Sequence, residues 1–242
     1  HLRSKRVQHP LAFSRARAVS HYVKFTYQCA RADIGSFDAL AEMNGCRRKL
    51  VEHGLMGVDS KGVGFGNLSI RDDVSGNFYI SGSATGGLRE LTSTDCVRVM
   101  AYDFARNWLR YEGAAIPSSE SLTHAAIYES DASTSAVIHC HDSDLWTMLL
   151  DRAPTTSKSV SYGTAEMAYE IIRLFKESDV PSKKIFVMAG HEPGVVTFGE
   201  NLGDAFDVLM SARELPQARC NVDRQHAGHS GQNLRARRQP AE

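Results

Sequence analysis

Apolar side chains recur along the chain with two different periods, and these periods predict a mixture of helices and strands. Helical spacing occurs in residues 37–53, 162–178 and 201–212, where one face of each segment is apolar. Residues 118–130 begin with the polar run Ser-Ser-Glu, which is typical of the start of a helix. We therefore predict a helix in each of these segments.

Short runs rich in β-branched residues predict strands between these helices. Residues 67–71 and 77–81 flank a Ser-Gly-Asn sequence that favours a tight turn, so we expect a hairpin. Four further strands are predicted at residues 96–100, 135–141, 185–189 and 194–198. Strands and helices in this order indicate an α/β fold, with a largely antiparallel or mixed sheet covered by helices.

The charge of the chain is zero overall but is unevenly distributed. Its 242 residues contain 28 Lys and Arg and 28 Asp and Glu. Residues 33–210 carry 15 basic and 25 acidic residues, a net charge of −10, and the basic excess lies in the two ends. Because an acidic domain is a poor surface for nucleic acid, we expect no nucleic-acid partner.

Composition narrows the class of protein further. A hydrophobic content of 42% argues against a disordered chain. No run of about 18 apolar residues occurs, so no membrane span is expected. The five cysteines are scattered without a CxxC pair, which disfavours a disulfide framework or a cysteine-based zinc site and favours a reducing, cytoplasmic location.

The two ends differ in composition from the region between them. Residues 1–36 form a basic segment that we expect to be a flexible extension, although an Arg-rich, acid-poor start is also typical of organellar targeting. Residues 37–212 are expected to form the folded domain. Residues 213–242, rich in Gln, Arg, Gly and His, are expected to be a polar basic tail.

The sequence His139-Cys140-His141 at the end of a predicted strand is the first candidate for chemistry. Side chains two residues apart on a strand share a face, so the two imidazoles lie side by side while Cys140 points away. A catalytic zinc needs about three protein ligands and one open position. His191, in the turn between the last two strands, could be the third ligand; otherwise these histidines are ordinary polar residues.

Glu120 stands near the start of the helix predicted for residues 118–130. It could ligate a metal or act as a base beside it, or it could be a helix-start carboxylate favoured by the helix dipole. His124 follows four residues later on the same helical face, either behind the metal ligands or as a buried structural histidine.

Three clusters of glycine and small polar residues, at residues 66–69, 81–87 and 118–119, could bind a phosphate. Backbone N–H groups and hydroxyls hold phosphate without Lys or Arg, although each cluster alone is also ordinary turn chemistry. The glycines of residues 62–66 have the wrong spacing for a dinucleotide-binding GxGxxG motif, and they precede a strand.

The order of these motifs resembles the class II aldolase/adducin family, which includes fuculose-phosphate aldolase and ribulose-phosphate 4-epimerase. The matching pieces are GNLS (66–69), ISGSATGGLRELT (80–92), PSSESLTHAAIY (117–128), AVIHCH (136–141), YGTAEMA (162–168) and GHEPGVVTFG (190–199). The paired histidines after the PSSE segment, followed by a third histidine before an apolar strand, are the most specific part of the match.

The resemblance implies a three-layer α/β/α fold with a central, mostly antiparallel sheet, assembled as a homotetramer. It implies a divalent metal, with zinc as the expected ion, on His139, His141 and His191. Glu120 matches the catalytic acid/base of the family. The positions that match the phosphate site are Asn67, Thr85, Gly86, Ser118 and Ser119.

The activity implied by the resemblance is that of a metal-dependent aldolase, a lyase. The metal stabilises an enediolate while a C–C bond breaks or forms in a small, phosphorylated sugar or hydroxy-carbonyl compound. Glu120 shuttles the proton.

Two features depart from the family pattern and leave the substrate open. Glu192 follows His191 directly and could be a ligand, a base or neither. No tyrosine stands between His141 and Tyr162, where fuculose-phosphate aldolase has one. Beside the aldolase, a sugar-phosphate epimerase or dehydratase of the same family and a non-catalytic adducin-like interaction module remain alternatives.

Overall fold

The structure is a computed structural model that describes residues 22–72 and 75–214. Residues 1–21 of the expected N-terminal extension and residues 215–242 of the expected tail lie outside this range. Within the described range, no helix combines the length and the apolar character needed to cross a bilayer.

An eight-stranded sheet with the order β1–β7–β6–β5–β4–β8–β10–β9 forms the centre of the molecule. Its strands are β1 (Thr26–Arg31), β4 (Asn67–Arg71), β5 (Phe78–Ser81), β6 (Cys96–Asp103), β7 (Trp108–Glu112), β8 (Ala136–His141), β9 (Ile185–Val187) and β10 (Gly194–Gly199). All neighbouring strands of this sheet are antiparallel except β1 and β7. A small second sheet pairs β2 (Gly57–Val58) with β3 (Gly64–Phe65). The predicted mostly antiparallel sheet is therefore confirmed.

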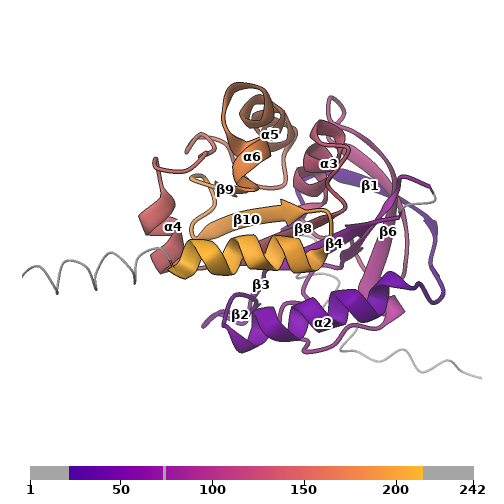
Figure 1. Cartoon of the computed structure of the whole chain (residues 1–242). Helices are drawn as coiled ribbons and strands as arrows, with labels where there is room; N and C mark the ends of the chain where they lie inside the picture. Colours follow the sequence, from indigo (N-terminus) through magenta and orange to yellow (C-terminus); the bar gives the residue numbers. More distant parts are fainter. Residues whose placement is uncertain (1–21, 73–74, 215–242) are drawn as a thin grey trace, which may run out of the picture.

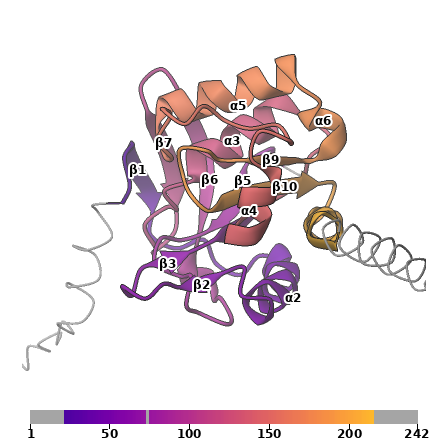
Figure 2. The same ribbon diagram turned by 90° about the vertical axis from the view of Figure 1, so that its left-hand side faces the viewer.

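Helices cover both faces of the sheet, as Figures 1 and 2 show. One face carries α3 (Ser121–Ser130), α5 (Ala165–Glu177) and α6 (Val180–Lys183). A short 3₁₀ turn, η1 (Ser93–Asp95), directly precedes β6. The other face carries α2 (Ala39–Glu52) and the helix of residues 202–214, with α4 (Ser143–Leu149) packed beside them. Each face has its own hydrophobic cluster. The fold is therefore the expected three-layer α/β/α arrangement.

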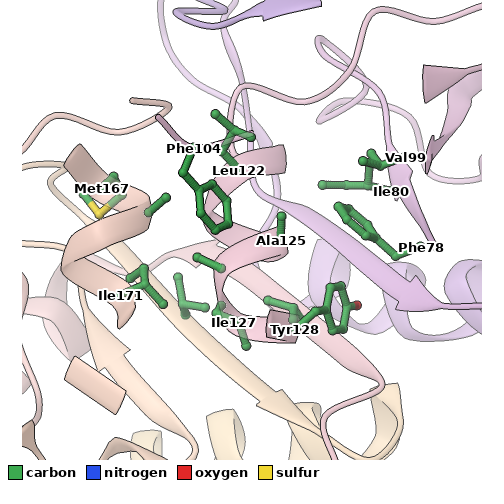
Figure 3. Packing of buried hydrophobic residues seen from close by; sticks show 14 of the residues in the cluster. Phe78, Ile80, Val99, Phe104, Leu122, Ala125, Ile127, Tyr128, Met167 and Ile171 are labelled. Carbon is green, nitrogen blue, oxygen red and sulfur yellow. The ribbon is translucent and has the colours of Figure 1, made fainter. Parts of the chain in front are cut away.

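The helix α3 is the best-buried helix of the face that it shares with α5. Its residues 121–128 are all buried, because the helix lies between the sheet and α5. Figure 3 shows Leu122 and Ile127 of this helix among side chains of the sheet and of α5. Close packing on all sides fixes the position of the first turn of α3, where Glu120 stands.

The sheet begins earlier in the chain than the domain boundary expected at residue 37. Residues 26–31 form β1, which pairs with β7 at the edge of the sheet, and the Asn107 side chain donates a hydrogen bond to Lys24 O at 2.8 Å. All six residues of β1 are exposed. Backbone hydrogen bonds rather than burial therefore hold this strand, and part of the segment expected to be a flexible extension belongs to the sheet.

Candidate metal centre and active site

Three histidines meet where β8 ends and β10 begins. His139 and His141 lie on β8, and His191 lies in the loop before β10, whose first residue, Gly194, is paired with His141. One ring nitrogen from each histidine lies within 4.8 Å of the other two. His141 Nε2 and His191 Nε2 are 3.2 Å apart, which is close to the separation of about 3.3 Å that two nitrogens have on one tetrahedral zinc ion.

Burial keeps the three imidazoles neutral. Loss of water contact lowers the pKa of His139 well below 6.5, and it lowers the pKa of His141 to about 4 and of His191 to about 3. His139 Nε2 is buried and has no hydrogen-bond partner among the described residues. A neutral imidazole with an uncommitted ring nitrogen is the form that binds a metal, so the residues present fit a divalent cation.

Glu120 is a buried carboxyl beside the histidines. Its Oε1 lies 3.8 Å from His191 Nε2, and its Oε2 accepts a hydrogen bond of 2.8 Å from Thr123 Oγ1. Burial raises the pKa of Glu120 to about 7, although the Thr123 hydroxyl and the charge of Lys24 act in the opposite direction. A carboxyl that gains and loses its proton near neutral pH is suited to general acid–base catalysis.

One pocket of about 550 Å³ brings the histidines and the expected phosphate-binding positions together. It is lined by Glu120, by the three histidines, and by Asn67, Thr85, Gly86, Ser118 and Ser119. The glycine at position 86 is required by close backbone packing, since a Cβ atom there would lie 2.7 Å from Phe65 N. The structure therefore brings every predicted site residue to the same pocket.

A buried arginine of α2 holds the loop that contains Thr85 and Gly86. Arg47 has no solvent exposure, and its guanidinium donates hydrogen bonds to the backbone carbonyls of Thr85, Gly86 (3.0 Å) and Leu88 (2.6 Å). It does not line the pocket. The role of Arg47 is therefore to fix the shape of the loop.

Three side chains around the histidines were not predicted from the sequence. Phe65 stacks on His141 with 5.1 Å between ring centroids, and Tyr162 packs on His191 at 4.3 Å. Lys24 Nζ lies 3.7 Å from the centre of the Tyr162 ring and donates to Ser161 Oγ at 2.6 Å. Tyr162 belongs to the YGTAEMA motif, but no local signal marks Phe65 or Lys24.

Neither of the two residues whose roles the sequence left open lines the pocket that holds the three histidines. His124 is fully buried, and its Nδ1 is 2.7 Å from Ser69 Oγ, which is also 2.7 Å from the Tyr128 hydroxyl. It does not line the pocket, so its position is that of a structural histidine. Glu192 is exposed and lines two neighbouring surface pockets instead. This placement favours neither a ligand nor a base role for Glu192.

Comparison with known proteins identifies the family of this fold and site. The family model described as the Class II Aldolase and Adducin N-terminal domain matches residues 42–219. A search of the curated proteins finds no significant match.

Solved structures of similar fold include three aldolase-type proteins. An L-fuculose 1-phosphate aldolase is 23% identical, with 78% of this chain and 88% of that chain covered and a TM-score of 0.59. A sugar-phosphate aldolase from Thermotoga maritima is 17% identical over 76% and 94% of the two chains, with a TM-score of 0.57. An aldolase II superfamily protein from Pseudomonas syringae is 17% identical, with 85% of this chain and 83% of that chain covered and a TM-score of 0.53. These structures share the fold, and the family model covers most of the chain. The chain therefore belongs to the class II aldolase and adducin family.

Proposed function

We propose that this chain is a metal-dependent lyase of the aldolase type. It would cleave or form a C–C bond in a small, phosphorylated sugar or hydroxy-carbonyl compound. The observation that carries the proposal is one pocket that combines three neutral histidines, whose ring nitrogens lie within 4.8 Å of one another, with a buried carboxyl whose pKa is about 7.

The histidine nitrogens are suited to zinc, which is usually bound by three protein ligands in catalytic sites. His139, His141 and His191 would hold the ion. When bound, it would supply Lewis-acid polarisation of the substrate oxygens. Glu120 would take up or deliver the proton at its Oε1, because this atom faces His191 and has no hydrogen-bond partner among the described residues.

The other lining residues would bind and orient the substrate. A phosphate group would be held by the amide, hydroxyl and backbone N–H groups of Asn67, Thr85, Gly86, Ser118 and Ser119. Phe65 and Tyr162 pack against the histidine rings and would limit the access of water.

The proposal is tested by assaying zinc-loaded protein against a panel of phosphorylated ketoses and detecting the aldehyde and the phosphorylated ketone that C–C cleavage releases. Wild type is compared with His141→Ala, with Glu120→Gln, and with Glu192→Gln, a control at an exposed carboxyl next to His191. We expect cleavage by wild type and E192Q, and losses of at least about 100-fold in E120Q and H141A.

Three outcomes would contradict the proposal. One is turnover that survives H141A, since the pocket histidines would then not be needed. A second is an isomerised or dehydrated sugar in place of cleavage fragments, which would identify an epimerase or a dehydratase. The third is absence of turnover on the whole panel together with absence of bound metal, which is the result expected of an adducin-like interaction module.

A further inference from the structure

We propose that Asn67 is a positioning residue of the histidine site. Its amide oxygen accepts a hydrogen bond from His139 Nδ1–H, which holds the ring in the tautomer whose Nε2 can bind a cation. This inference rests on the metal-binding role proposed above. It assigns to Asn67 a contact with a metal ligand, in addition to its expected place in the phosphate site.

Asn67 and His139 face each other on adjacent strands. They are directly opposed in the antiparallel ladder of β4 and β8, where opposed side chains come close enough to interact. Both are buried, with 7% of Asn67 and 2% of His139 exposed. The contact between them joins the terminal amide of Asn67 to His139 Nδ1 at 3.2 Å.

The other ring nitrogen of His139 points toward the remaining ligands. A Cβ atom built on Gly194 would lie 3.0 Å from His139 Nε2 and 3.0 Å from the Cδ2 atom of His191, so these two rings flank the same glycine. His139 Nε2 has no partner within residues 22–72 and 75–214. It is therefore the nitrogen that faces the place where a cation would be held.

The chemistry of a neutral imidazole decides which end of the amide must face the ring. Such a ring carries one N–H, so a ring that binds a cation through Nε2 keeps its proton on Nδ1. Nδ1 is then a donor, and the amide atom 3.2 Å away must be the acceptor, Oδ1. Metal-binding histidines commonly donate their second N–H to an oxygen in this way.

The amide is free to adopt this orientation. The oxygen and nitrogen of an asparagine amide are nearly the same size, and their assignment follows from the hydrogen bonds that they make. The structure has Nδ2 toward the ring and leaves Oδ1 buried without a partner among the described residues. No hydrogen bond to Oδ1 therefore opposes a 180° turn of the amide, which brings the oxygen onto Nδ1–H.

The first test is zinc affinity, measured by competition with a chromophoric chelator in phosphate-free buffer. Asn67→Asp keeps an oxygen acceptor at this position, whereas Asn67→Leu has a similar size and no acceptor. Asn77→Leu is the matched control, because it makes the same substitution at a residue that does not line the pocket. We expect N67L to bind zinc roughly 10- to 100-fold more weakly than wild type, while N67D and N77L stay close to wild type.

The second test reads the tautomer of His139 in the metal-free protein from long-range ¹H–¹⁵N correlation spectra, so its result does not depend on zinc binding. We expect the proton on Nδ1 in wild type and N67D. A proton on Nε2 in wild type, or wild-type zinc affinity in folded N67L, would overturn the inference. If N67L does not fold, the wild-type tautomer and the zinc affinity of N67D decide it.

The two proposals fail in distinguishable ways. If wild type binds no zinc but carries the His139 proton on Nδ1, the metal-dependent function is wrong and the position of Asn67 stands. If wild type binds zinc and its tautomer or the behaviour of N67L contradicts the expectation, only the role of Asn67 is wrong.

Discussion

At the scale of single residues, burial sets the protonation state of each group around the pocket. Loss of water contact lowers the pKa of His191 to about 3 and raises that of Glu120 to about 7. The two shifts have opposite directions because a buried site disfavours whichever form is charged. At neutral pH the three histidines therefore carry no charge and Glu120 is only partly ionised, which reduces the cost of burying these groups.

The buried carboxyl makes the stability of the metal-free protein depend on pH. A glutamate has a pKa of about 4.3 in an unfolded chain, and that of Glu120 is about 7 in the folded protein. Between these values the folded state binds more protons than the unfolded state, so the free energy of unfolding falls as pH rises. The full loss is on the order of 4 kcal/mol.

We predict that Glu120→Gln removes this loss, because the amide stays neutral at every pH. In urea denaturation with a chelator present, E120Q should be more stable than wild type at pH 8 and similar to it at pH 4, below the pKa of a glutamate in the unfolded chain. A difference of the same size at both pH values would show that Glu120 does not titrate between them.

The glycine at the start of β10 has little room for a side chain. A Cβ atom on Gly194 would lie 2.7 Å from His191 O and 3.0 Å from His139 Nε2. We predict that Gly194→Ala displaces a ligand ring and weakens zinc binding by about tenfold or more. Gly45→Ala is the control, since a Cβ atom there meets nothing within 4 Å. Equal zinc affinity of G194A and G45A in a titration would contradict the predicted crowding.

At the scale of elements, helices and strands with a strong apolar periodicity were predicted correctly from the sequence. The helix α5 lies within the predicted residues 162–178, and its buried side chains are Met167, Ala168, Ile171 and Leu174. The predicted hairpin is found as β4 and β5, with Ser69 opposite Ile80. In each case the residues that produced the pattern are those that the fold buries, so local sequence and tertiary packing agree.

Elements that polar contacts hold in place show no such apolar periodicity in the sequence. The strand β1 is exposed along its whole length. The short helix α4 is capped by Asp142, whose side chain accepts a hydrogen bond from Leu145 N at 3.0 Å and pairs with Arg213 at 2.8 Å. Arg213 is 71 residues away in the sequence, so no local window contains this contact. Tertiary partners rather than periodicity specify both elements.

The same distinction applies to the site. The HxH spacing on β8 already placed His139 and His141 on one face, because that follows from strand geometry alone. Phe65 and Lys24 come from segments more than 70 residues before the histidines that they surround. Their places depend on how β3 and β1 pack, which the sequence pattern does not reveal.

The contact between Arg47 of α2 and the loop that contains Thr85 and Gly86 leads to a prediction about stability. Replacing Arg47 by Met removes the donors for the backbone carbonyls of Thr85, Gly86 and Leu88. An unsatisfied buried polar group costs about 1–3 kcal/mol, so we predict that R47M lowers the free energy of unfolding by about 3 kcal/mol or more. The measurement is urea denaturation.

The adjacent residue provides the control for this prediction. Arg48 forms an exposed ion pair with Glu90 at 2.9 Å, and such pairs contribute about 1 kcal/mol or less. Arg48→Met should therefore cost much less than R47M. Similar losses in the two variants would mean that the loop does not depend on Arg47.

At the scale of the whole molecule, side chains on one face of the sheet contribute to the pocket, and side chains on the other face pack in a hydrophobic cluster. Glu120, on the α3 side, and the β8 residues His139 and His141 form the pocket, whereas Ile138 and Cys140, which alternate with these histidines, belong to the cluster beneath α2. Burial raises the pKa of the Cys140 thiol, which keeps it protonated. One strand thus supports both the candidate chemistry and the hydrophobic core.

The net charge of the molecule bears on how the pocket would bind an anionic substrate. The segment 33–210 has a net charge of −10, so long-range attraction does not favour an anionic substrate. A phosphorylated compound would instead be bound by the neutral hydroxyl, amide and N–H groups of the pocket and by a cation on the histidines. The central claim therefore depends on whether these histidines hold a metal.

Elemental analysis of the purified full chain after zinc loading and dialysis tests this claim most directly. Wild type is compared with the His139→Ala, His141→Ala, His191→Ala triple variant and with His53→Ala, a histidine at the end of α2 that does not line the pocket. We predict about one zinc ion per chain in wild type and H53A, and none in the triple variant. Folded wild-type protein without stoichiometric zinc, or a triple variant that retains it, would contradict the account.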